Sequence, residues 1–175
     1  IPTVTLQLES IKRSLVTSVA PELPPEAAFA RQQVLLIGAA LDFLIECHAH
    51  EYRYAVVENA EYRTLLKELA GRASNSSTDV TDVLAEDGPA PTDAQLPLPT
   101  ITEQTRRMKV LCERLYADVA AGGGADIPAV LDLQAKTAER QVEREASWFR
   151  LAGFTMDSPP IDVVLGLESG ADDYV

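Results

Sequence analysis

The sequence predicts an all-α fold, a bundle of four main helices in one domain that spans residues 1–175. Ala and Leu supply most of the apolar content, and aromatic residues are only 6% of the chain, which favours helices packed on helices over a β-sandwich. Apolar residues recur at helical spacing in long segments. Proline or glycine clusters separate these segments, and 175 residues suit one domain with a real core.

The first predicted helix covers residues 4–19. Val4, Leu8, Ile11, Leu15 and Val19 share one face at helical spacing. The proline-rich stretch 20–25 ends it, because proline cannot continue a helix.

The second predicted helix starts near Pro25 and ends before Gly71. A single helix of roughly 45 residues is unusual in a small domain. Residues 34–45 are apolar except for Asp42, so we expect this half to be buried on most sides. Either the helix breaks between Glu46 and Arg53, or its far half meets another subunit.

A long loop is predicted over residues 72–99, where prolines and acidic residues accumulate. Such a loop in a compact domain is either functional or mobile. Within it, Val80, Val83 and Leu84 could form one short helical turn against the bundle. The third helix is expected to start at Thr100, which has capping-box spacing to Glu103, and to end at the glycines 122–124.

The fourth predicted helix starts after Asp126 and ends at Gly153. A polar row of Gln134, Thr137 and Gln141 replaces part of its aliphatic face, so the row could line a polar cavity or a subunit contact. The tail, residues 154–175, is expected to pack on the bundle or on a neighbour.

Charge and cysteine content narrow the class of protein. The net charge of −12 disfavours binding to nucleic acid or to anionic membranes, because both need a basic face. No uncharged run of about 18 apolar residues is present, so no transmembrane helix is expected, and the start of the chain lacks a signal-peptide layout. Two cysteines do not make a disulfide framework. We expect a cytoplasmic protein with reduced thiols.

The only two histidines lie in the stretch ECHAHEYRY, residues 46–54. On a regular helix, His48 and His50 point to nearly opposite sides and cannot hold one metal together. His48 continues the apolar stripe and is interpreted as a core histidine with a hydrogen-bond partner. A ligand, a general base or a subunit contact stay open as alternatives for His48. His50 is expected to be exposed beside Glu46.

A metal site is not expected. A di-metal bundle needs a Glu-x-x-His motif on each of two helices, and the sequence has none. The only candidate zinc ligands are Cys47, His48, His50 and Cys112, and they would need Cys112 alongside the second helix. No cofactor is expected.

Two acidic residues of the second predicted helix are further candidates for a functional site. Asp42 and Glu46 could form a partly buried ion network with Arg31, Arg53, Arg106 or Arg107, where raised carboxyl pKa values would permit acid–base work. The alternative is that Asp42, Glu46 and Arg53 mark one wet stripe of the second helix. The charged residues of 139–145 are interpreted as a solvated helix face.

The first 45 residues also carry a resemblance. They contain LESIKRSL at 8–15, APELP at 20–24 and ARQQ at 30–33, followed by an Ala/Leu-rich helix. This resembles the start of a family of uncharacterised bacterial helical proteins encoded beside aminoglycoside-phosphotransferase-like and acyl-CoA-dehydrogenase-like enzymes. The resemblance covers about a quarter of the chain. It implies a helical bundle and an accessory role near such enzymes, and it transfers no functional residue.

These observations lead to three functional hypotheses. The first is a non-catalytic helical protein that binds a partner protein or a small apolar ligand between its helices. The second is an enzyme or metal protein that uses Glu46, Cys47 and His48. The third is a structural homodimer accessory to a neighbouring enzyme, and we expect a homodimer in general. The candidate site residues are Asp42, Glu46, His48, Tyr52, Gln134, Thr137 and Gln141.

Overall fold

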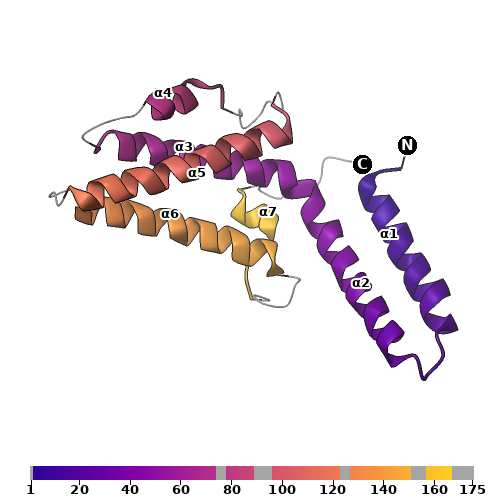
Figure 1. The fold of residues 1–175 in the computed structure, drawn as a ribbon. Coiled ribbons are helices and arrows are strands. Elements are labelled where there is room, and N and C mark those ends of the chain that lie inside the picture. The colour runs from indigo at the N-terminus through magenta and orange to yellow at the C-terminus, as the bar shows by residue number, and fades with distance from the viewer. Residues whose placement is uncertain (1, 74–77, 89–95, 123–126, 151–156, 167–175) are drawn as a thin grey trace. The chain divides into compact units, whose positions relative to one another are not determined.

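The structure is a computed structural model that describes residues 2–73, 78–88, 96–122, 127–150 and 157–166. It is 84% helical, and the described residues contain no strand, so the all-α prediction is confirmed. The helices in chain order are α1 (Val4–Ser14), α2 (Ala28–Cys47), α3 (Glu51–Ala70), α4 (Thr78–Ala85), α5 (Leu98–Ala121), α6 (Ile127–Trp148) and α7 (Ile161–Val164) (Figure 1).

The chain divides into two compact units. Unit 1 consists of Ile1–Glu51 and Arg144–Val175, and unit 2 consists of Tyr52–Glu143. Two units of this size are compatible with one domain or with two, so the single domain over 1–175 stays a prediction.

In unit 1, α1 and α2 form a helical hairpin (Figure 1). The first predicted helix is confirmed over 4–19, with its last turn, Leu15–Val19, wound as a π-helix. A short 3-10 turn at Ala20–Glu22 follows, and the chain then turns into α2. Lys12 of α1 makes an ion pair with Asp42 of α2, and both side chains are partly exposed.

The expected burial of α2 is wrong. Its only buried side chains are Leu41 and Cys47. The large apolar side chains of α2 that remain exposed are Phe29, Leu35, Leu36, Ile37 and Leu44. The reason is geometric, because α1 covers one side of α2 and an apolar helix needs cover all round.

The expectation about membrane spans also changes. The stretch Ala28–Ala70 contains an 18-residue window with no more than two charged residues, and by length and composition alone this window is apolar enough to cross a membrane. The sequence-based expectation required an uninterrupted apolar run. It missed this window because single charged residues interrupt the apolar sequence.

The second predicted helix is broken, which was one of its two predicted alternatives. The backbone tightens into a 3-10 turn at His48–His50, between α2 and α3. A 3-10 turn inside a long helix changes the direction in which the following side chains point. The histidine stretch of the sequence is therefore the joint between the two helices.

Unit 2 holds the main apolar core. The buried cluster contains Leu65, Leu66 and Leu69 of α3, Val80 and Val83 of α4, Met108, Leu111, Cys112 and Leu115 of α5, and Val130 of α6. These positions recur every three or four residues along each helix, so one face of each helix is buried.

The predicted loop 72–99 is partly helical. Val80 and Val83 lie in α4 and are buried, so the expected short helical segment is confirmed and is longer than one turn. The capping box is wrong, because α5 starts at Leu98, its N-cap is Pro97, and Thr100 already lies inside the helix. Pro99 suits the first turn, where its missing N–H leaves no bond unmade.

The fourth predicted helix is α6, and its expected limits Asp126 and Gly153 lie outside the described residues. Of the tail, Ile161 and Leu165 are buried in unit 1. The hydroxyl of Ser147 donates to the carbonyl of Pro159 at 2.7 Å, which ties the tail to the end of α6.

Candidate functional site

A pocket of about 350 Å³ lies between α3, α5 and α6 in unit 2. Its lining residues are Tyr62 and Leu65 of α3, Lys109, Cys112, Glu113 and Tyr116 of α5, and Gln134, Thr137, Ala138 and Gln141 of α6. All three members of the predicted polar row are among them. The row therefore lines a cavity, which was one of its two predicted roles.

Helical spacing places these side chains together. The α6 lining residues are spaced 0, 3, 4 and 7 along the sequence, and so are those of α5. Residues with this spacing share one face of a helix. Each helix therefore presents a single face to the pocket.

Two contacts hold α3 against α6 beside the pocket. The hydroxyl of Tyr62 donates to Oε1 of Gln141 at 2.8 Å. The guanidinium of Arg140 lies 3.2 Å from Oε1 of Glu61. Thr137 is buried, and its hydroxyl donates to the carbonyl of Leu133 at 3.0 Å. Thr137 therefore contributes to the shape of the pocket wall, and its hydroxyl proton is already used.

Lys109 is held in place by two neighbours. Its Nζ donates to Oε1 of Glu58 at 2.7 Å and lies 5.0 Å from the centre of the Tyr62 ring. The positive charge is thus neutralised at the pocket wall.

Tyr116 has a hydroxyl to which no other lining residue is hydrogen-bonded. Its hydroxyl is buried and has no hydrogen-bond partner among the described residues. Burial raises the pKa of Tyr116 to about 12, and the neighbouring Cys112 and Tyr62 act in the same direction. The hydroxyl keeps its proton at neutral pH and can donate it to an acceptor.

Cys112 is not an activated thiol. Burial raises its pKa to about 12, and the charge of Glu113 adds to the increase. A nucleophilic cysteine needs the opposite shift. Cys112 therefore remains a protonated thiol at neutral pH.

The histidine stretch belongs to unit 1 and makes structural contacts. Nδ1 of His48 lies 2.9 Å from the carbonyl of Leu44, and Nε2 lies 3.3 Å from the hydroxyl of Thr5. A carbonyl only accepts, so Nδ1 carries a proton, and in the neutral ring Nε2 accepts from Thr5. His48 thus has two partners where one was expected. His50 is half-buried, which corrects its expected exposure.

The neighbours of His48 are also engaged. Glu46 makes an ion pair with Arg150 at 2.7 Å, and Asp42 pairs with Lys12. The predicted arginine partners of these acids are therefore wrong. Both true partners come from other segments of unit 1, and sequence spacing gave no signal for them.

Cys47 is buried, and its Sγ donates to the carbonyl of Trp148 at 3.4 Å. Burial raises the pKa of this thiol to about 11, with a further increase from the charge of Glu46. Nearby, the rings of Phe43 and Phe149 stack with centroids 5.9 Å apart. No group of three or more metal-ligating side chains occurs in the described part of the chain.

Tyr52, the remaining candidate, has a structural contact. Its hydroxyl donates to the carbonyl of Leu96 at 3.0 Å, which fastens the segment before α5 to α3. The solvated face expected at 139–145 also needs a correction, because Arg144 is buried.

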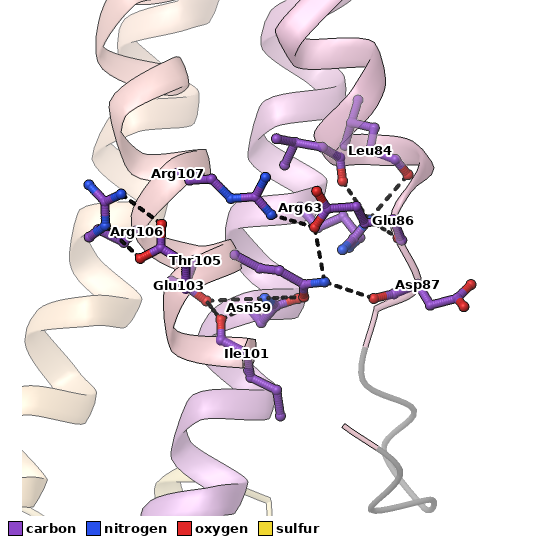
Figure 2. A network of polar contacts seen from close by, with 12 residues as sticks. Asn59, Arg63, Leu84, Glu86, Asp87, Ile101, Glu103, Thr105, Arg106 and Arg107 are labelled. Atoms are coloured by element: carbon purple, nitrogen blue, oxygen red, sulfur yellow. Dashed lines mark hydrogen bonds and ion pairs between the residues drawn. The ribbon is translucent and has the colours of Figure 1, made fainter. Parts of the chain in front are cut away.

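Unit 2 contains a buried polar network that the sequence analysis did not predict (Figure 2). Asn59 of α3 is fully buried, and its amide donates toward the carbonyl of Ile101, Oε1 of Gln104 and the hydroxyl of Thr105 on α5. Gln104 in turn donates to Glu86 and to the carbonyl of Asp87. The available signal was a polar residue within each of two apolar stripes, Asn59 in the stripe of α3 and Thr105 in the stripe of α5.

Arg63 completes this network. Its guanidinium donates to the carbonyls of Val83, Leu84 and Glu86, at the end of α4, as Figure 2 shows. The last carbonyls of a helix have no partner within the helix. The Glu86 carboxylate also pairs with Arg107, and this contact lowers the pKa of Glu86. The network fastens α4 to α3 and α5.

A second pocket, of about 420 Å³, lies between α4 and α5 and is lined by Asp79, Asp82, Val83, Arg106, Arg107, Val110, Leu111 and Arg114. Its arginines already face carboxylates. Arg106 pairs with Glu103, Arg107 with Glu86, and Arg114 lies 4.0 Å from Asp79. Arg107 Nε, like the Tyr116 hydroxyl, is buried without a hydrogen-bond partner among the described residues. The pocket between α3, α5 and α6 is the better candidate because it gathers Gln134, Thr137 and Gln141 around Tyr116.

The chain matches no protein-family model, and comparisons with curated proteins and with solved structures find no match.

Proposed function

We propose that the chain is a non-catalytic protein that binds a small, mainly apolar ligand in the pocket between α3, α5 and α6. The observation that carries this proposal is the pocket that Gln134, Thr137 and Gln141 line together with Tyr116, whose buried hydroxyl has no partner among the described residues. The volume of about 350 Å³ falls within the range of small-molecule sites.

The lining indicates the chemistry of the ligand. Leu65 and Ala138 offer apolar surface, and Tyr116 offers a neutral donor. The charge of Lys109 is already held by Glu58. A ligand with an apolar body and one hydrogen-bond acceptor would fit this wall, since a buried donor gains most from an acceptor that water does not compete for.

A binding function is preferred over catalysis for a physical reason. Cys112 and Tyr116 both keep their protons at neutral pH, so neither is an activated nucleophile or base. The alternative of an enzyme or metal protein built on Glu46, Cys47 and His48 has less support, because Arg150, the Trp148 carbonyl, Thr5 and Leu44 already occupy their polar atoms.

Native mass spectrometry on protein purified from cells tests the proposal. The wild type should carry an additional small-molecule mass. Ala138→Phe, which fills the pocket, should lose it. Ala135→Phe should retain it, because Ala135 is exposed on the same helix and does not line the pocket. A wild type without added mass, or a mass that Ala138→Phe retains, would refute the proposal.

The broader setting is also proposed. The chain acts in the cytoplasm as a homodimer, beside acyl-CoA-dehydrogenase-like or phosphotransferase-like enzymes, and a protein partner is the alternative to a small ligand. The bundle of four main helices belongs to this proposal, and what supports it is the apolar cluster to which α3, α5 and α6 all contribute. Purification from the native host with an affinity tag tests the partner, because a neighbouring enzyme should then co-purify.

A further inference from the structure

The outward face of α2 is an apolar surface without a cover in unit 1. Phe29 is 74% exposed and Leu36 is 55% exposed, and Ile37 and Leu44 are exposed as well. Large aliphatic and aromatic side chains on one helix of a folded protein are normally covered. Contiguous exposed patches of this kind mark interaction sites.

These side chains form one stripe. At 100° per residue, Phe29, Leu36, Ile37 and Leu44 fall within an arc of about 100° on α2, and Ala40 lies inside it. Leu35, 74% exposed, lies outside the arc, and Cys47 lies inside it but is buried. Asp42, which pairs with Lys12 of α1, lies on the opposite side of the helix. The buried Leu41 lies about 40° beyond Ile37, so the stripe borders the covered face of α2.

The charges of α2 are kept off the stripe. Arg31, Asp42 and Glu46 are the charged residues of the helix, and all three lie outside the arc. Gln33 is the polar residue within it. An interface core is depleted of charge in the same way.

We propose that this stripe, defined by Phe29, Leu36, Ile37, Ala40 and Leu44, is where a second copy of the chain docks, with the two α2 helices antiparallel. The proposal rests on the homodimer proposed above and assigns its interface. The four large side chains, Phe29, Leu36, Ile37 and Leu44, are spaced symmetrically about a centre between Leu36 and Ile37, and Gln33 is the counterpart of Ala40. A two-fold axis there places Phe29 opposite Leu44 of the other copy, as an isologous contact requires.

The size of the stripe agrees with a dimer contact. Four large side chains at roughly 100 Å² each give about 400 Å² of apolar surface per copy. A standard interface covers about 800 Å² per partner, and somewhat more than half of it is apolar. Antiparallel helices also place opposite ends of their dipoles together.

A membrane is the less favoured occupant. Helices that lie on membranes carry Lys and Arg on the polar face, whereas the polar side of α2 has Arg31 against Asp42 and Glu46, in a chain of net charge −12. A spanning hairpin would also have to bury Lys12 and Arg13, which lie in the last turn of α1.

Sedimentation equilibrium of the full chain tests the interface with a matched pair of variants. Leu36 on the stripe and Leu6 on α1 are both 55% exposed. Leu36→Glu should weaken dimerisation at least tenfold, and Leu6→Glu should leave it unchanged. Circular dichroism should show equal helix content in both variants, because neither leucine is buried.

Three results would overturn the interface. A monomeric wild type would refute the homodimer and this interface together. A dimer that persists in Leu36→Glu would refute the interface alone. A monomeric wild type that sediments with phosphatidylcholine–phosphatidylglycerol vesicles, while Leu36→Glu stays in the supernatant, would assign the stripe to a membrane. None of these results bears on the pocket in unit 2.

A cross-linking experiment checks the register. Leu36→Cys lies next to the proposed two-fold axis, so oxidation should give a disulfide-linked dimer. Leu6→Cys should stay monomeric on denaturing gels. Equal cross-linking of both variants would contradict the antiparallel register.

Discussion

At the scale of single residues, Asn59 shows how a polar side chain is accommodated in the core of unit 2. It is fully buried, and its amide nitrogen has acceptors on Ile101, Gln104 and Thr105, whereas its Oδ1 has no partner among the described residues. Burying an amide is unfavourable unless such bonds are made. The side chain therefore specifies which part of α5 lies against α3.

Asn59→Ala should lower the free energy of unfolding by about 2–3 kcal/mol, because it leaves a cavity and unpaired acceptors on α5. Urea denaturation measures the change. Thr64→Ala is the control, since Thr64 is exposed and bonds only within its own helix, and it should change stability by less than about 0.5 kcal/mol. Equal effects of the two substitutions would show that the network has no special role.

The two thiols give a prediction for pH. Burial raises the pKa of Cys47 to about 11 and that of Cys112 to about 12, from an ordinary value of 9.0. Between pH 9 and 11 the unfolded chain releases thiol protons that the folded chain keeps, so stability should fall as pH rises through this window. Urea unfolding at pH 8, 9 and 10 should show the decline, and Cys47→Ala/Cys112→Ala should reduce it.

The same burial predicts low thiol reactivity. Alkylation by iodoacetamide at pH 8 should be roughly 100-fold slower than for the unfolded chain, because the thiolate is the reactive form. Mass spectrometry of the labelled protein measures the rate. Rapid labelling of Cys112 in folded protein would indicate that the pocket opens widely.

At the scale of elements, α4 is an eight-residue helix fastened from outside. The side chains of Val80 and Val83, on one side of α4, are buried in the core of unit 2. Arg63 of α3 donates to the carbonyls at the end of α4. So short a helix is not stable alone. Its place between 72 and 99 depends on these tertiary contacts.

Arg63→Ala should destabilise the fold by about 1.5–3 kcal/mol, the usual contribution of hydrogen bonds to a charged group. Hydrogen exchange should also become faster in α4 before it changes in α5. Arg106→Ala is the matched control, since its pair with Glu103 is exposed on one helix, and such pairs contribute less than about 1 kcal/mol. Unchanged exchange in α4 of Arg63→Ala would contradict this account of the helix.

At the scale of the whole molecule, the two units differ in how much core each helix contributes. The buried cluster of unit 2 has members from α3, α4, α5 and α6, whereas α2 in unit 1 buries only Leu41 and Cys47. Local stability follows buried apolar contacts. The hairpin should therefore be the less stable part of an isolated chain.

Hydrogen exchange with mass spectrometry checks this difference. At low protein concentration, peptides of α1 and α2 should exchange through openings of lower free energy than peptides of α5. If α2 is the dimer contact, its protection should rise with protein concentration, because association stabilises the bound form. Full protection of α2 at the lowest concentration would contradict both expectations.

The sequence by itself determined the helices and several of their junctions. The end of the first helical segment at the prolines follows from local rules, since caps, prolines and apolar spacing act within a few residues. The same rules left the break near His48–His50 as one of two alternatives and the short helix around Val80 as a possibility. The polar row of α6 was also visible, because Gln134, Thr137 and Gln141 interrupt an apolar stripe.

Only the tertiary structure decided what these side chains meet. Asp42 pairs with Lys12 and Glu46 with Arg150, residues 30 and 104 positions away. Tyr116 becomes a buried donor because α3 and α6 lie beside α5. The exposure of α2 was equally out of reach, because an apolar helix has the same sequence pattern whether its own chain or a partner covers it. Contacts between distant segments depend on how helices pack, and helical periodicity records only that a face is apolar.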